Sequence, residues 1–276
     1  MLKNIVQIGF SLVLIYTIIY PLINQPNQQL VSKTSDAGSL KQPQVTSDEA
    51  QTLQETVEIK PHPLPDFAAI YDVKEKKRAF FSYLSPYVEQ INKEILRHRE
   101  FVLRMEKRPQ FQKDIEHLNK IAKKYHVDTE QDFSQIRALL LLRVDILPIE
   151  LVLMQAANES AWGTSRFALV ANNLFGQWCF SKGCGVVPSG RPEGKTYEVR
   201  KFNHPIDSIK SYYNNLNTGY AYEDLRNIRK QLRDQQQSID AIELAHGLLA
   251  YSTRREEYVS EIQKMISINK KYITNG

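Results

Sequence analysis

One acidic residue, Glu159, has surroundings that could give it unusual acid–base chemistry. It lies near the end of a predicted helix, Pro148–Ser160, and Val152 and Ala156 precede it on the same helical face. We expect that face to pack inward, which places the Glu159 carboxyl group at the margin of an apolar core. Such burial raises the pKa of a carboxyl group, and a protonated carboxyl can protonate the leaving oxygen of a glycosidic bond. The alternative is an exposed carboxylate at a helix end.

Aromatic and amide side chains follow Glu159 closely. The chain has two tryptophans, Trp162 and Trp178, and Phe175 lies between them. Flat aromatic rings beside hydrogen-bonding amides are typical of sugar-binding clefts. The amides of this stretch are Asn158, Asn172, Asn173 and Gln177. An ordinary aromatic core cluster is the alternative interpretation.

The two cysteines, Cys179 and Cys184, are separated by four residues. A zinc site would need further ligands, and no nearby histidine or cysteine supplies them. Outside the cytoplasm the pair would close a small disulfide loop. The six histidines of the chain show no metal-ligand spacing, so we expect neither a metal nor a cofactor.

Apolar periodicity predicts that helices position these residues. A stripe at spacings of three and four runs through one long segment, although Pro86 should kink or restart the helix. Its members are Phe80, Leu84, Tyr87, Ile91, Ile95, His98, Val102 and Met105. Further helices are expected over residues 111–125 and 133–143 and again from Pro205 onward.

The segment Asn172–His204 differs, because it is rich in glycine and proline and contains both cysteines. We expect loops and a β-hairpin there, with one strand near Lys195–Phe202. The chain after its N-terminal part is therefore predicted to be mainly α with one small β excursion.

The N-terminus predicts the compartment. Ile5–Ile23 contains no charge, and a helix of ~20 mostly apolar residues can cross a bilayer. No small-residue cleavage site follows, so we expect an uncleaved signal anchor, with a cleaved signal peptide as the alternative. Gln25–Lys60 lacks aromatic residues and is rich in Gln, Ser and Thr, which predicts a flexible tether.

Composition excludes several classes of protein. The chain has 276 residues, 42% hydrophobic and 24% charged, and a net charge of +5. These values exclude a chain that is disordered throughout and a polytopic membrane protein. The mild basicity is compatible with an acidic polymer or lipid surface. With the expected outward topology, we do not expect nucleic-acid binding.

Three separated strings resemble the glucosaminidase family of lysozyme-like peptidoglycan hydrolases, and within it Bax-type proteins of Gram-negative bacteria. The first is QAANESAWGTS at Gln155–Ser165, followed by NNLFG at Asn172–Gly176. The others lie within Gly194–Thr218 and Leu248–Tyr258. The resemblance implies a mainly α, lysozyme-like α+β domain with a small β-hairpin beside the cleft, preceded by helices and a membrane anchor. It also implies hydrolysis of the β-1,4 bond after N-acetylglucosamine.

The resemblance assigns roles to particular residues. Glu159 matches the general acid, and Glu198 on the hairpin is the candidate second carboxylate, with Glu193 as the alternative. We expect Glu198 to face the cleft on the same side of the strand as Arg200. Tyr251 matches a tyrosine near the cleft. The expected substrate-binding residues are Asn158, Trp162, Asn173, Leu174, Phe175, Trp178 and Tyr258.

Two mechanisms are compatible with these assignments. A base at Glu198 would activate water and invert the anomeric centre if the two carboxyl groups lie ~6.5–9.5 Å apart. Otherwise the N-acetyl oxygen of the substrate could attack the anomeric carbon with assistance from Tyr251. Competing hypotheses are a muramidase or lytic transglycosylase, and a non-catalytic peptidoglycan-binding protein tethered to the membrane.

The resulting organisation has four parts. We expect an anchor or signal peptide at residues 1–24, a linker at 25–65, a helical region at 66–141 and a catalytic domain at 142–276. The expected location is the inner membrane with a periplasmic catalytic domain, or the periplasm if the N-terminal segment is cleaved. Peptidoglycan glycan strands and the membrane are the expected partners.

Overall fold

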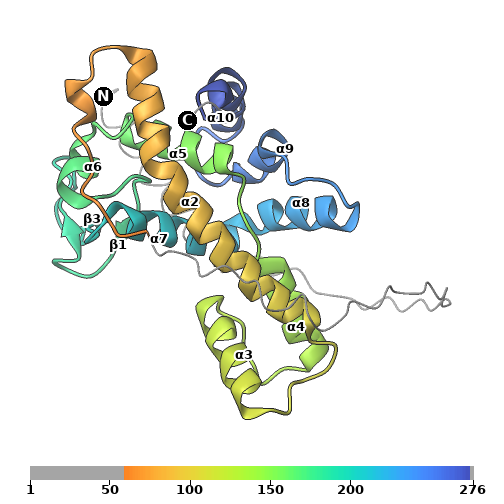
Figure 1. Ribbon diagram of the computed structural model, residues 1–276. Helices are drawn as coiled ribbons and strands as arrows, with labels where there is room; N and C mark the ends of the chain where they lie inside the picture. The colour runs from red at the N-terminus through yellow and green to blue at the C-terminus, as the bar shows by residue number, and fades with distance from the viewer. Residues whose placement is uncertain (1–58, 274–276) are drawn as a thin grey trace, which may run out of the picture. The chain divides into compact units, whose positions relative to one another are not determined.

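The computed structural model describes residues 59–273, which form a mainly helical unit with one small sheet (Figure 1). This confirms the expected mainly α class with a small antiparallel sheet. The α-helices are α2 (Val73–Arg104), α3 (Gln112–Lys124), α4 (Phe133–Arg143), α5 (Ile149–Ser160), α6 (Arg166–Ala171), α7 (Pro205–Thr218), α8 (Glu223–Asp234), α9 (Ala241–Ala245) and α10 (Glu256–Asn269). Short 3-10 turns are η2 (Phe67–Ala69), η3 (Tyr220–Tyr222), η4 (His246–Leu248) and η5 (Lys270–Tyr272).

The predicted apolar stripe forms the buried face of α2. The Asp72 carboxylate caps its first turn by accepting a hydrogen bond of 2.7 Å from the backbone N–H of Glu75. The restart expected at Pro86 does not occur, because α2 continues through this residue. Pro86 removes the N–H that would bond the carbonyl of Ser82, and the adjacent Ser85 hydroxyl donates to the carbonyl of Phe81.

Helix α5 is the centre of the fold. Every residue from Leu151 to Ala157 is buried, because α2, α9 and α10 pack around this helix. A helix that is apolar on nearly all sides needs such enclosure. Because α5 is fixed on several sides, the residues at its C-terminal end, including Glu159, have well-defined positions.

The sheet contains three short strands in the order β1-β3-β2. β2 (Gly185–Val186) and β3 (Glu198–Arg200) form an antiparallel pair, as expected for the hairpin. β1 (Trp178–Cys179) adds a third strand that the sequence did not predict, with Cys179 opposite Glu198. The sheet thereby fixes the disulfide region beside Trp178.

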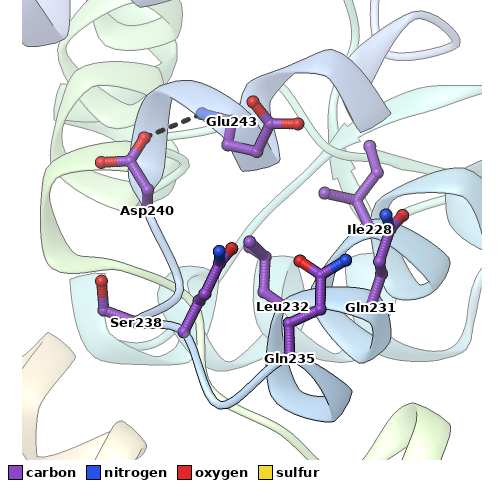
Figure 2. A pocket seen from close by; sticks show the side chains of 8 residues that line it. Ile228, Gln231, Leu232, Gln235, Ser238, Asp240 and Glu243 are labelled. Carbon is purple, nitrogen blue, oxygen red and sulfur yellow. Dashed lines mark hydrogen bonds between the residues drawn. The ribbon is translucent and has the colours of Figure 1, made fainter.

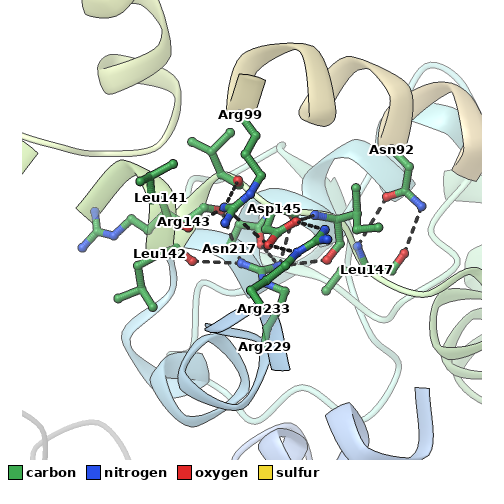
Figure 3. A network of polar contacts seen from close by, with 12 residues as sticks. Asn92, Arg99, Leu141, Leu142, Arg143, Asp145, Leu147, Asn217, Arg229 and Arg233 are labelled. Atoms are coloured by element: carbon green, nitrogen blue, oxygen red, sulfur yellow. Dashed lines mark hydrogen bonds and ion pairs between the residues drawn. The ribbon is translucent and has the colours of Figure 1, made fainter. Parts of the chain in front are cut away.

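A buried polar network joins α2, the α4–α5 connection and α8 (Figure 3). The Asp145 side chain is 2% exposed and pairs with Arg99 of α2 and Arg233 of α8. The Arg229 guanidinium donates to the main-chain carbonyls of Leu142 and Asp145 and to Asn217. The predicted border at residues 141/142 falls inside this network, and the hydrophobic core is continuous across it.

The last part of the predicted linker, from Ile59 onward, is described by the structure and is hydrogen-bonded to α2. The backbone N–H of Ile59 donates to Gln90 at 3.1 Å, and that of His62 donates to the Tyr87 hydroxyl at 3.0 Å. The predicted anchor and most of the predicted linker lie outside the described residues. Within residues 59–273, no helix combines the length and apolar character needed to cross a membrane.

Candidate active site

Glu159 occupies the last turn of α5, where the chain turns sharply. Ala161, Trp162 and Gly163 all have positive φ, at 50°, 59° and 77°. The Ser160 hydroxyl stabilises the turn by accepting a 2.8 Å hydrogen bond from the Gly163 N–H. Glycine is required at 163, because an added Cβ would lie 2.6 Å from the Phe67 ring.

The Glu159 carboxyl group is half-buried and hydrogen-bonded. The Tyr258 hydroxyl donates to Oε1 at 2.9 Å, and the Asn158 amide approaches the same atom at 3.4 Å. Burial raises the pKa of Glu159 above its ordinary value, although the hydrogen bonds from Tyr258 and Asn158 oppose this shift. The group is therefore biased toward the protonated form that an acid catalyst needs.

A chain of buried hydrogen bonds extends from Glu159 into the core. The Gln155 amide N–H donates to the Tyr258 hydroxyl at 2.9 Å, and the Tyr212 hydroxyl donates to Oε1 of Gln155. Burial raises the pKa of Tyr258 and Tyr212, so both hydroxyls keep their protons and act as neutral donors. The relay fixes the orientation in which Tyr258 meets Glu159.

Tyr251 completes this tyrosine cluster. Its ring stacks on that of Tyr258 with centroids 5.4 Å apart and planes at 8°. Its hydroxyl donates to the main-chain carbonyl of Phe175 at 3.3 Å. Burial raises the pKa of Tyr251, so this hydroxyl also remains a donor at neutral pH.

Glu159 lines a pocket of about 630 Å³. No other lining residue of this pocket carries a carboxylate. The remaining lining is mainly aromatic rings, amides and hydroxyls, which suits a neutral polyhydroxylated ligand. The lining residues are His126, Glu159, Phe175, Gly176, Gln177, Trp178, Arg200, Ser211, Asn214, Asn215, Thr218, Gly219, Tyr222 and Tyr251.

Another hollow, of about 500 Å³, lies between α8 and α9 and lacks aromatic side chains (Figure 2). Its Asp240 carboxylate accepts hydrogen bonds from the backbone N–H groups of Ile242 and Glu243, so it caps α9. Because the Asp240 carboxylate is used as a helix cap and no aromatic ring is present for sugar stacking, this hollow is a weaker candidate for the active site than the Glu159 pocket.

Sequence comparison relates the chain to a known family and to a known protein. The family profile described as mannosyl-glycoprotein endo-beta-N-acetylglucosaminidase, named Glucosaminidase, matches residues 138–271. Protein bax of Escherichia coli (strain K12) is 34% identical over 212 residues, which cover 76% of each chain.

The chain belongs to the glucosaminidase family. The resemblance to Bax-type members is thereby confirmed, and the family match indicates a glycoside-hydrolase domain. No solved structure matches the chain significantly, so the lysozyme-like part of the fold remains a prediction.

The predicted substrate-binding residues of this glucosaminidase domain occupy different kinds of position in the structure. Phe175 and Trp178 line the pocket, and Trp178 is half exposed. Asn173 is buried and shapes the wall, since its amide N–H donates to the carbonyls of Gln177 and Arg200 at 2.9 Å. Leu174 belongs to the core.

The other three predicted residues, like Asn173 and Leu174, are not among the residues that line the pocket. Asn158 and Tyr258 act on Glu159 through the hydrogen bonds described above. Trp162 packs against the rings of Phe80 and Phe81, with the Lys77 ammonium 5.0 Å from its ring centre. It therefore packs beside α2, and its sugar contact stays a prediction.

Glu198 is the first residue of β3, opposite Cys179 of β1, and is not among the residues that line the Glu159 pocket. Its side chain is only 4% exposed, and its two oxygens accept hydrogen bonds from the N–H groups of Gly183 at 3.0 Å and Gly185 at 2.8 Å. These bonds lower its pKa. Arg200 lines the pocket, whereas Glu193 is exposed in the preceding loop.

Cys179 and Cys184 form a disulfide that closes a short loop, residues 179–184 (the disulfide loop). Together with Glu198 they make the only group of possible metal ligands found within residues 59–273. Both sulfurs are engaged in the disulfide, so this group does not offer a thiolate site.

The polar face of α7 was missed by the sequence analysis, although it supplies four pocket residues. Ser211, Asn214, Asn215 and Thr218 all line the pocket. They recur at steps of three and four residues, which was the available signal. Gln155 had a different signal, since it is a polar residue within the apolar run of α5.

Proposed function

We propose that this protein hydrolyses the β-1,4 bond after N-acetylglucosamine in peptidoglycan glycan strands, with Glu159 as the general acid. The observation that carries the proposal is a single half-buried carboxyl group with a raised pKa in an aromatic and amide-lined pocket. The family match supports the chemistry, and the pocket lining supports a glycan substrate.

In the proposed reaction, Glu159 passes its proton to the oxygen that bridges the two sugars. The bond between this oxygen and the anomeric carbon breaks, and the oxygen leaves as the hydroxyl of the next sugar. We favour attack on the anomeric carbon by the acetamido oxygen of the same N-acetylglucosamine, which forms a cyclic oxazolinium. Water then opens this ring, and the Glu159 carboxylate takes the proton from that water.

The disposition of Glu198 and Tyr251 supports the substrate-assisted route. Glu198 would have to give up its hydrogen bonds to Gly183 and Gly185 before it could activate water in the pocket. Tyr251 already lines the pocket and keeps its proton, and it would exchange one long hydrogen bond, 3.3 Å to the Phe175 carbonyl, for one to the substrate. We assign it as a hydrogen-bonding partner of the acetamido group. A base at Glu198 is the competing assignment.

We also propose that the protein acts outside the cytoplasm, anchored through Ile5–Ile23. The disulfide between Cys179 and Cys184 supports an oxidising compartment. A membrane tether would keep the catalytic domain beside the cell wall.

Digestion of purified peptidoglycan with mass analysis of the new ends tests the proposed bond. We expect products with N-acetylglucosamine at the reducing end. Reducing-end N-acetylmuramic acid would indicate a muramidase, and a 1,6-anhydro end would indicate a lytic transglycosylase. Binding without any cleavage would leave the protein as a wall-binding module, and each of these three results contradicts the proposal.

A further inference from the structure

A smaller cavity of about 210 Å³ lies beside the Glu159 pocket, between α2, the end of α3 and α7. Its floor is apolar and buried, whereas its rim carries charged side chains. The lining residues are Ile91, Glu94, Ile95, Lys124, Tyr125, Lys210, Tyr213, Asn214 and Asn217. Neither the family match nor the proposed reaction assigns it a role.

Two features show that this cavity adjoins the Glu159 pocket. Asn214 lines both spaces. The consecutive residues Tyr125 and His126 also separate them, because Tyr125 lines the small cavity and His126 lines the large pocket. A ligand in the large pocket could therefore extend a branch past Asn214 into the small cavity.

The rim of the cavity has an excess of positive charge. Lys124 and Lys210 face a single carboxylate, Glu94, which is bonded to Lys124 at 2.6 Å. Among the described residues, no carboxylate forms a close ion pair with Lys210. Its exposed ammonium group is available to an anionic ligand.

The floor and the junction restrict the kind of anion that fits. Ile91, Ile95, Tyr125 and Tyr213 are at most 4% exposed, so the floor favours small apolar side chains. The Asn214 side-chain amide makes no hydrogen bond with any described residue and can pair with a peptide group. A short peptide with apolar residues and a free carboxylate combines these properties.

We propose that the small cavity binds the carboxylate-bearing peptide that branches from the glycan strand, with Lys210 as the carboxylate ligand. This inference rests on the proposed function, because the strand must first occupy the Glu159 pocket. It gives α2 and α3, which precede the residues of the family match, a part in substrate selection.

The test compares two substrates and two charge reversals in the full-length protein. The substrates are purified peptidoglycan and the same glycan stripped of its peptides by an amidase. Lys210→Glu changes the cavity, and Lys264→Glu on α10 makes the same change in net charge at an exposed site that lines neither space. Thermal unfolding of both variants verifies that they are folded.

We expect Lys210→Glu to raise KM about tenfold on peptide-bearing strands and to leave KM on stripped strands unchanged. Lys264→Glu should show no such selectivity. An equal effect of Lys210→Glu on both substrates, or no difference from Lys264→Glu, would overturn the inference.

Failure of the proposed function would look different, because the wild-type protein would then leave other sugar ends or cleave neither substrate. With other ends, the KM comparison above still tests the inference. Without any cleavage, co-sedimentation of the same three proteins with the two preparations decides the inference. Selective loss of binding to peptide-bearing material by Lys210→Glu supports it, and equal binding by all three proteins overturns it.

Discussion

Tyr258 is the residue that most directly tunes the acid–base behaviour of Glu159. Its hydroxyl donates to the carboxyl group at 2.9 Å and opposes the rise in pKa that burial causes. In Tyr258→Phe the pKa of Glu159 should therefore rise further. We expect the basic limb of the pH–rate profile to move to higher pH and the rate at its maximum to fall.

The control for this prediction is Tyr220→Phe, which removes the hydroxyl of an exposed tyrosine outside the pocket lining. It should leave the profile unchanged. A Tyr258→Phe protein with a wild-type basic limb would show that this hydrogen bond does not control the titration.

Glu198 and Glu193 provide a matched pair of carboxylates for testing the second catalytic group. Glu198→Gln replaces one acceptor of the Gly183 and Gly185 N–H groups by an NH2 donor, so we expect a lower Tm and a kcat within about tenfold of wild type. Glu193→Gln should change neither value. If Glu198→Gln lowered kcat by ~10²–10⁴ at unchanged Tm, Glu198 would be the base.

Sequence reasoning at the residue scale found Glu159 because helical spacing predicts its apolar surroundings. It could not find the hydrogen-bonded relay, because Gln155 and Tyr258 are 103 positions apart. The same limit applies to Glu198, whose partners are the backbone N–H groups of Gly183 in the disulfide loop and Gly185 in β2. Residue types do not reveal such pairings before the chain is folded.

At the scale of elements, the disulfide loop stabilises the sheet that carries Trp178. Replacing Cys179 and Cys184 by serine removes the loop closure, which contributes about 2 kcal/mol for so short a loop. We expect a lower Tm and a higher KM, because Trp178 lies beside Cys179 in β1 and lines the pocket.

Thermal unfolding with and without reductant checks this prediction. Reductant should lower the Tm of the wild-type protein and leave that of the double serine variant unchanged. Equal Tm values for the two oxidised proteins would contradict the stabilising role.

Long elements were predictable, and short ones were not. The stripe of α2 repeats over many turns, so its buried face follows from spacing alone. β1 and β2 have two residues each and carry no periodic signal. Their pairing with β3 depends on tertiary contacts, which explains why the third strand was missed.

At the scale of the whole molecule, Asp145 joins helices that are distant in sequence. Burial alone would raise its pKa, but the hydrogen bond from Arg233 and the charges of Arg229 and Arg99 hold the pKa below its ordinary value. Asp145→Asn should therefore lower the free energy of unfolding by about 3–5 kcal/mol near neutral pH. Denaturant unfolding across pH measures the loss.

The pH dependence follows from the lowered pKa. The stabilisation is present above the unfolded-state pKa of about 3.8 and is lost as pH falls through the folded-state value. The difference between wild type and Asp145→Asn should shrink there. Asp234→Asn, which removes an exposed pair with Lys230, is the control and should cost only ~0.3–0.5 kcal/mol. Equal losses in the two variants would contradict the role of the network.

The pocket itself is a whole-molecule feature that the sequence indicated only in part. Its lining comes from α5, from β1 and the loop that precedes it, from β3, from α7, and from Tyr222 and Tyr251. His126 comes from the connection after α3. The three family-like strings cover much of this set, but nothing in the strings locates His126. Its place in the lining depends on tertiary packing, in which α4 contacts α2 and α8.

The measurement that tests the central claim most directly is the rate of peptidoglycan hydrolysis by Glu159→Gln. The amide keeps the shape of the side chain and can still accept the Tyr258 hydrogen bond, but it has no acidic proton to transfer to the leaving oxygen. We predict a fall in rate on the order of 10²–10⁴ or more, with Tm at least as high as that of the wild-type protein at pH 8, since the variant no longer buries an ionisable group. A folded Glu159→Gln protein with near wild-type activity would contradict the account.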